Sequence, residues 1–175
     1  ACYFLWFIAA LGIMLGAFYR VSVFIFIVAF GYLQLLDATN YINHYYALLI
    51  FAIFLFISPA NCSFSIDAYR NPAIRRLHIP AFYVFIFKFQ IAIIYLFASI
   101  AKLNSDWMLS AMPLKIWLLQ QQDFPIIGRL FHYHFLHLLA SWFAFFFDFT
   151  IVIWLCIART RKLAYSFVII FHTLT

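Results

Sequence analysis

The sequence has no glutamate, and its five carboxylate side chains are all aspartates. Carboxylate-bridged di-iron bundles place a Glu and a Glu-x-x-His motif on facing helices, so this chain does not fit that class. Charged residues make up only 9% of the 175 residues. Soluble domains contain about a quarter charged residues, so the composition excludes an ordinary soluble globular protein.

Cysteine is also scarce, and the three cysteines lie far apart without a CxxC motif. The chain therefore carries no disulfide framework. It also lacks a Gly-rich phosphate loop, a nucleophile elbow and a heme-attachment motif. The three cysteines are Cys2, Cys62 and Cys156.

The densest group of histidines is His132, His134 and His137. Only His134 and His137 share a helix face, and no cysteine or acidic residue accompanies them at the spacing of metal ligands. Histidine has an apolar body and a polar tip, which suits a membrane interface. We therefore predict no metal site.

Apolar residues dominate the composition, because 69% of the residues are hydrophobic and 25 of them are phenylalanines. Several apolar stretches approach the roughly 20 residues that cross a bilayer. We predict an all-α, polytopic transmembrane bundle that forms one domain over residues 1–175. Because the chain starts and stops inside apolar runs, we expect it to be part of a longer protein. About six spans are predicted, at residues 2–18, 21–36, 41–58, 81–102, 132–158 and 163–175.

The fourth span carries a polar stripe. Lys88, Tyr95, Ser99 and Lys102 lie at relative positions 0, 7, 11 and 14, which place them on one side of a helix. Polar atoms within lipid must face other protein or trapped water, so this stripe predicts one wall of an intramembrane cavity. For Lys102 alone, a lysine that reaches the lipid headgroups from a helix end is an equal interpretation.

Four further polar residues lie in or beside the predicted spans: Asn43, His44, Asp148 and His172. Ionisable groups within a membrane are costly, which favours a functional role. Polar contacts between helices are the alternative for Asp148 and His172, and an ordinary packing role is the alternative for His44.

The distribution of basic residues predicts the orientation. Seven of them lie in odd-numbered connections and only two in even-numbered ones, which places the odd connections in the cytoplasm. Lys102 and His44 are then both expected near the non-cytoplasmic face. Because the basic residues cluster at the ends of spans, they give no indication of nucleic acid binding. The seven are Arg20, Arg70, Arg75, Arg76, Arg159, Arg161 and Lys162, and the two are Lys115 and Arg129.

Several motifs occur together in order. They are ALGIMLGAFYRVS at residues 10–22, then LLDATNYINHYYALL, the basic loop that ends in RRLHIP, and FQIAIIYLFASIAKLNSDW. Asp148 and His172 follow, 24 residues apart. In these motifs the sequence resembles the vitamin K-dependent gamma-glutamyl carboxylase family, whose membrane part is called the HTTM domain.

The resemblance implies an enzyme that oxidises reduced vitamin K, or a related hydroquinone, with O2. The oxidation creates a strong base that removes a proton from a protein glutamate, to which CO2 adds. By this resemblance Lys102 is the amine that deprotonates the hydroquinone and His44 assists it. We assign quinone-binding roles to Asn43, Lys88, Tyr95, Ser99, Asp148 and His172.

The expected partners are membrane lipid, the quinone and a glutamate-containing protein substrate, but no nucleic acid. The expected location is a bacterial inner membrane or the endoplasmic reticulum, with the active site towards the non-cytoplasmic side. Some positions depart from the family pattern. Ala101 replaces a second lysine, Ser141 stands where a histidine is expected, and the region after Pro113 is dissimilar.

Three interpretations remain open from the sequence. The first is the carboxylase itself, and the second is a relative that oxidises a quinol-like lipid without carboxylating glutamate. The third is a non-enzymatic membrane scaffold or lipid-binding subunit, in which the polar residues join helices. Epoxide formation, measured separately from CO2 fixation, distinguishes the first two.

Overall fold

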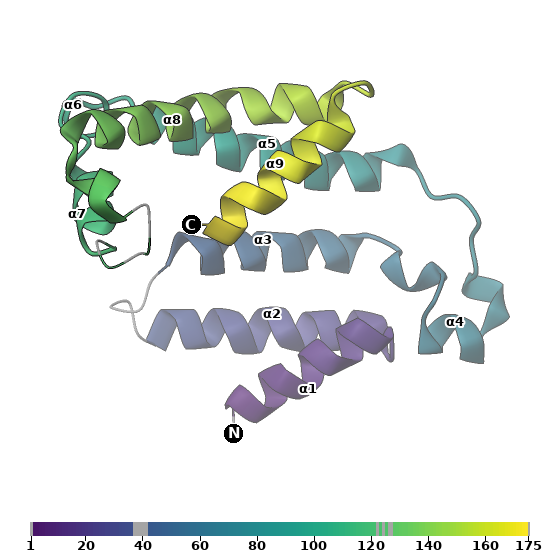
Figure 1. Ribbon diagram of the computed structural model, residues 1–175. Coiled ribbons are helices and arrows are strands. Elements are labelled where there is room, and N and C mark those ends of the chain that lie inside the picture. Colours follow the sequence, from purple (N-terminus) through teal and green to yellow (C-terminus); the bar gives the residue numbers. More distant parts are fainter. Residues whose placement is uncertain (1, 37–41, 122, 124, 126–127, 175) are drawn as a thin grey trace. The chain divides into compact units, whose positions relative to one another are not determined.

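The computed structural model describes residues 2–36, 42–121, 123, 125 and 128–174. All the regular elements in these residues are helices, which confirms the predicted fold class (Figure 1). The chain divides into two compact units, Ala1–Lys88 and Phe89–Thr175, and the single domain predicted over both stays a prediction. The α-helices are α1 (Cys2–Leu15), α2 (Tyr19–Leu36), α3 (Asn43–Ile57), α4 (Ile66–Arg70), α5 (Ala81–Ala101), α6 (Ser105–Met108), α7 (Met112–Leu119), α8 (His134–Cys156) and α9 (Arg161–Leu174). Short 3-10 helices are η2 (Ala60–Cys62), η3 (Pro72–Ile74) and η4 (Gly128–His132).

Three of the helices in the described residues are long and apolar enough to cross a membrane, namely α2, α5 and α8. The predicted count of about six spans is therefore not confirmed. Helices α1 and α3 are apolar but have only 14 and 15 residues. At 1.5 Å per residue such helices reach about 21–23 Å, which is less than the roughly 30 Å hydrocarbon core.

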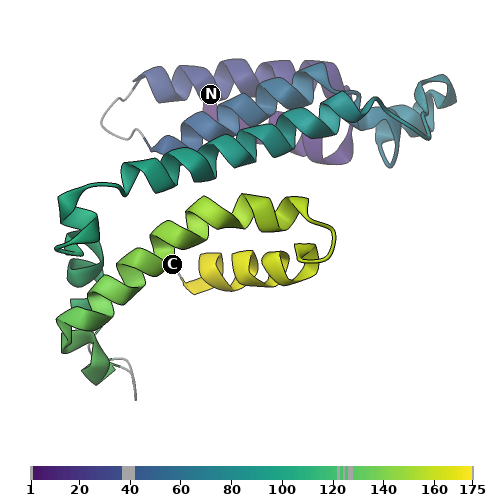
Figure 2. The same cartoon turned by 90° about the horizontal axis from the view of Figure 1, so that it is seen from above.

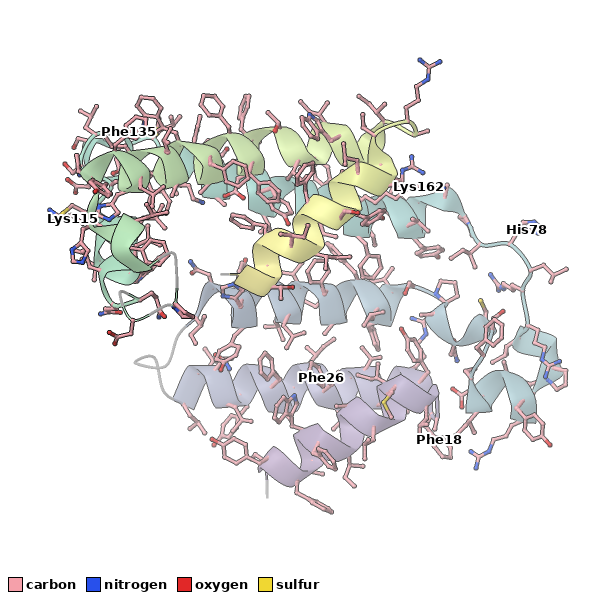
Figure 3. The ribbon with its side chains drawn as sticks, in the orientation of Figure 1. Phe18, Phe26, His78, Lys115, Phe135 and Lys162 are labelled. Atoms are coloured by element: carbon pink, nitrogen blue, oxygen red, sulfur yellow. The ribbon has the colours of Figure 1, made fainter. Side chains whose placement is uncertain are left out.

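In the first unit, α1, α2 and α3 lie side by side (Figure 1). Gly12 allows α1 and α2 to approach closely, because a Cβ there would lie 2.3 Å from Ser22 Oγ. Gly16 ends α1 with φ +61°, and a Cβ on it would lie 2.3 Å from Ser65 Cβ. The buried core of this unit contains Ala9, Phe26, Phe30 and Ala52, against which Trp6 packs (Figure 3).

Asp67, in the first turn of α4, closes the turn between α1 and α2. Its carboxylate accepts hydrogen bonds from the backbone N–H groups of Phe18 and Tyr19, both at 2.9 Å, and from the Asn61 side chain at 3.1 Å. It therefore satisfies donors at the start of α2 that have no partner within that helix. Burial, the largest influence, raises the pKa of the Asp67 carboxyl. The hydrogen bonds and the charge of Arg70 together outweigh burial, so this pKa lies below its ordinary value.

Replacing Asp67 with asparagine is expected to destabilise the protein in a pH-dependent way. Loss of a helix cap costs about 1 kcal/mol. Because the folded-state pKa is lowered, the stabilisation is fully present above the ordinary pKa of about 4 and is lost as the pH falls through the folded value. Thermal unfolding in detergent should therefore show a lower Tm for Asp67→Asn at pH 7, and the difference should shrink below about pH 4.

Asp106, an exposed aspartate in the first turn of α6, provides the matched control. Asp106→Asn should leave Tm close to that of the parent protein at both pH values. A Tm difference for Asp67→Asn that is equally large at pH 7 and in acid would contradict the role of the Asp67 charge.

In the second unit, α8 and α9 form a helical hairpin (Figure 2). Phe147, Ile151 and Ala164 are its buried core, and Tyr95 and Phe171 pack against them. The rings of Phe147 and Phe171 stack with centroids 4.3 Å apart. Thus α5, α8 and α9 each contribute to one apolar layer.

The hairpin connection satisfies the last carbonyl groups of α8. Thr160 Oγ1 donates to the Trp154 carbonyl at 2.8 Å, and Arg161 Nε donates to the Leu155 carbonyl at 3.0 Å. At the other end of α8 lies α7, which begins beside Pro113 as the sequence predicted.

Candidate functional site

The second unit contains a contact between Lys102 and Asp148. Lys102 directly follows α5, and its Nζ lies 2.5 Å from Oδ2 of Asp148 on α8. The same Nζ donates to the Ala98 carbonyl at 3.3 Å and lies 5.2 Å from the centre of the Trp107 ring. The side chains are 18% and 7% exposed. A carboxylate, a carbonyl and an aromatic face thus surround the amine, and each interacts favourably with an ammonium group.

The end of α5 explains the position of Lys102. The last carbonyls of a helix lack partners, and a lysine just beyond the end can donate to them, as Lys102 does to Ala98. Asn104 then caps α6 by accepting from the Trp107 N–H at 2.8 Å. This cap places the Trp107 ring beside Lys102.

Ser141 holds Trp107 in place from α8. Its hydroxyl donates to the Trp107 carbonyl at 2.6 Å, and the Trp107 ring N–H donates to the Ser141 carbonyl at 3.0 Å. Ser141 is fully buried. Next to it, the Trp142 ring N–H donates to the Met108 carbonyl at 2.8 Å. The serine that departs from the family pattern therefore positions one wall of the site, which sequence reasoning missed.

A second polar contact joins α5 to α9. The Tyr95 hydroxyl and His172 Nε2 are 2.8 Å apart, and the Tyr95 ring meets Phe147 edge-on with centroids 6.3 Å apart. Ser99 is fully buried, and its hydroxyl donates to the Leu96 carbonyl of its own helix at 2.7 Å. Three members of the predicted stripe, Tyr95, Ser99 and Lys102, thus lie in the second unit with Asp148 and His172.

The other predicted site residues belong to the first unit. Lys88 is exposed and ends the first unit, 14 residues before Lys102 on α5. Asn43 and His44 are exposed in the first turn of α3, also in the first unit. A site shared by His44 and Lys102 stays a prediction. The sequence also allows Asp37 or Thr39 to cap a helix that starts near Asn40, and these three residues lie outside the described part of the chain.

An apolar groove of about 330 Å³ runs between α8 and α9. Phe147 lines it and also contacts Tyr95, so the groove and the polar contacts share a wall. The sequence signal for this groove is the set of phenylalanines at helical spacing on α8. The second wall of the groove comes from another helix, α9. The lining residues are Phe143, Phe146, Phe147, Thr150, Ile151, Trp154 and Phe167.

The histidines near residue 134 do not form a metal centre within the described part of the chain, where no three His, Cys or Asp side chains come together. His137 is buried, and its Nε2 bonds the Phe131 carbonyl at 2.7 Å. The rings of His134 and His137 meet edge-on, 6.2 Å apart between centroids.

The chain matches a known protein family along its length. The HTTM domain matches residues 1–175, the whole of the sequence. No solved structure matches the chain.

Proposed function

The chain belongs to the HTTM domain family, and from this premise we propose that it oxygenates a hydroquinone within the membrane. The HTTM domain is found in the vitamin K-dependent carboxylase and related proteins. The observation that carries the proposal is the Lys102–Asp148 contact of 2.5 Å, because oxygenation of a hydroquinone begins with removal of a phenolic proton.

The Lys102–Asp148 pair can take up one proton from a substrate, whichever of the two side chains holds the proton that they share. If the pair is an amine with a carboxylic acid, Lys102 Nζ is the acceptor. If it is an ammonium with a carboxylate, Asp148 Oδ2 is the acceptor, and both routes end as an ammonium beside a neutral acid. A phenol has a pKa near 10, so it requires a base held in a water-poor place. Lys102 is the base we propose.

The charge left on the phenolic oxygen also has a partner. Once Lys102 has taken the proton, its ammonium offsets that negative charge at short range. The Tyr95–His172 contact supplies further polar atoms in the same unit that can donate to or accept from a bound quinol oxygen.

The groove between α8 and α9 fits the rest of a quinol. An isoprenoid tail is apolar and flexible, and a groove lined by phenylalanines and a tryptophan in the membrane region would bind it by burying apolar surface. The quinol would then reach the site laterally from the bilayer. The distribution of basic residues supports a site towards the non-cytoplasmic side.

The overall reaction balances with O2 as oxidant. A hydroquinone and O2 give the quinone epoxide and water, and this oxidation drives removal of a γ-hydrogen from glutamate and addition of CO2. We include the carboxylation because of the family resemblance, with reduced vitamin K or a related hydroquinone as substrate. A glutamate-containing protein would be the second substrate.

The experiment is a two-product assay on the full-length protein in liposomes. A vitamin K hydroquinone is supplied with O2, and the epoxide is measured by chromatography while labelled CO2 is followed into a glutamate-containing peptide. Formation of both products is the expected result. Epoxide without labelled peptide would restrict the function to quinol oxygenation. Absence of both products, with the protein still folded, would overturn the proposal in favour of a scaffold or lipid-binding role.

A further inference from the structure

A second depression lies in the first unit, among residues that the proposed reaction does not use. It has a volume of about 310 Å³, and two arginines, Arg20 and Arg76, line it together with Asn61 and Ile74. Arg20 is in the first turn of α2, and Arg76 follows η3 in the loop between α3 and α5. Two arginines from distant parts of the sequence thus line one pocket.

The charge of this pocket is not neutralised from within. Its lining residues include no carboxylate. The nearby Asp67 carboxylate already accepts hydrogen bonds from Phe18, Tyr19 and Asn61. The pocket therefore favours an anion.

Hydrogen bonds hold the two segments that carry the arginines. Arg20 donates to the Phe56 carbonyl and lies 5.7 Å over the Phe56 ring, which fixes it against the end of α3. On the other wall, the backbone N–H of Arg76 bonds the Cys62 carbonyl at 3.4 Å. A guanidinium has five N–H donors, so Arg20 keeps donors for a ligand after its bond to Phe56.

Exposed apolar side chains in the segment that carries Arg76 indicate that the ligand is part of a lipid. Phe64 and Leu77 are 108% and 98% exposed, although they flank a polar segment rich in arginine. Arg20 lies in the first turn of an 18-residue helix long enough to span a bilayer, and the end of such a span would emerge from lipid beside the pocket. Apolar side chains beside basic ones at this level are typical of a surface that inserts among lipid headgroups.

We propose that the pocket of Arg20 and Arg76 binds the phosphate group of an anionic phospholipid. The guanidinium groups would form charge-assisted hydrogen bonds to the phosphate oxygens, which arginine suits by its planar set of donors. Phe64 and Leu77 would enter the acyl region beside the bound headgroup. The site is separate from the Lys102–Asp148 pair, and its occupation does not depend on the proposed oxygenation.

The test measures lipid binding by the full-length protein in neutral detergent. Fluorescent phosphatidylglycerol and fluorescent phosphatidylcholine are titrated in parallel. We expect tighter binding of phosphatidylglycerol, a loss of roughly tenfold or more in Arg20→Gln/Arg76→Gln, and partial recovery in Arg20→Lys/Arg76→Lys. Arg76→Gln alone should weaken binding several-fold and leaves the Arg20–Phe56 contact intact, so it guards against a folding defect.

The control is Arg159→Gln, which removes an exposed arginine from the α8–α9 connection. This variant should bind phosphatidylglycerol like the parent protein. Equal affinity for the two lipids would overturn the proposed binding site. A loss of affinity in Arg159→Gln as large as that in Arg20→Gln/Arg76→Gln would also overturn it. Displacement of phosphatidylglycerol by inorganic phosphate at similar concentrations would show a free-phosphate site and would also overturn the lipid assignment.

Discussion

Lys102→Arg is expected to lose hydroquinone oxygenation by about 10²–10⁴-fold, the usual effect of losing a general base. A guanidinium remains protonated, so it can neither accept the phenolic proton nor give its own proton to Asp148. It can still pair with the carboxylate, and the fold should survive. The measurement is the rate of epoxide formation, with thermal unfolding as the check on folding.

At position 102, substitution by arginine tests the proposed base more directly than substitution by alanine. Lys102→Ala would leave the Asp148 carboxylate, only 7% exposed, without its cationic partner, and such an unpaired charge is strongly destabilising. If Lys102→Ala still folds, a small exogenous amine should restore part of the activity, and more so as the pH rises and the free-amine fraction grows.

Lys88→Arg is the matched control, because Lys88 is exposed and lies 14 residues earlier on the same helix, about 21 Å away at 1.5 Å per residue. It should retain the parent rate. Near-normal epoxide formation in Lys102→Arg would show that residue 102 supplies only charge. The base would then have to be sought at Asp148, with His44 the next residue to test.

The common face of Tyr95, Ser99 and Lys102 could be predicted because a helix advances by a fixed angle at each residue. Their partners could not. Asp148 lies 46 residues beyond Lys102 and His172 lies 77 beyond Tyr95, so each pairing depends on how α5, α8 and α9 pack. Both partners could be recognised in the sequence as groups that are costly within a membrane. The sequence does not show how close they lie to Lys102 and Tyr95.

Lys88 and the number of spans show what periodicity leaves undetermined. Lys88 has the same helical phase as Lys102, but phase does not reveal whether a neighbouring helix is present along the whole length of α5. Composition likewise marks an apolar stretch without marking where the helix ends. At residues 16–18 the chain remains apolar, yet Gly16 and Phe18 have positive φ and interrupt the helix. The first predicted span is therefore shortened to α1.

The tertiary partners of small polar residues were the hardest features to predict. Asp67 caps α2 from 48 residues away, and nothing in the local sequence pairs it with Tyr19. Ser141 exchanges two hydrogen bonds with Trp107, although a serine within an apolar helix is an ordinary residue. Both depend on tertiary contacts, which sequence periodicity does not describe.

Asp148→Asn is expected to reduce the rate of oxygenation by about 10²-fold at pH 7. The rate of this variant should recover at higher pH. The Asp148 carboxylate lies 2.5 Å from Lys102 Nζ, so it can take the lysine proton and free the amine for the substrate. An amide cannot take that proton, so Lys102 has to lose it to the solvent before the amine can act as a base. At alkaline pH the solvent can remove the proton instead, so the rate should recover.

A purely structural role for Asp148 would give a different result. Lost packing or a displaced helix would lower the rate at every pH, and thermal unfolding would reveal it. Asp106→Asn, at an exposed aspartate of the same unit, should follow the pH profile of the parent protein. Combined with Lys102→Arg, the Asp148→Asn change should add little further loss, because residues that act as one unit are strongly non-additive. A double variant whose loss equals the product of the two single losses would show that Lys102 and Asp148 act independently, and the proton-sharing pair would have to be abandoned.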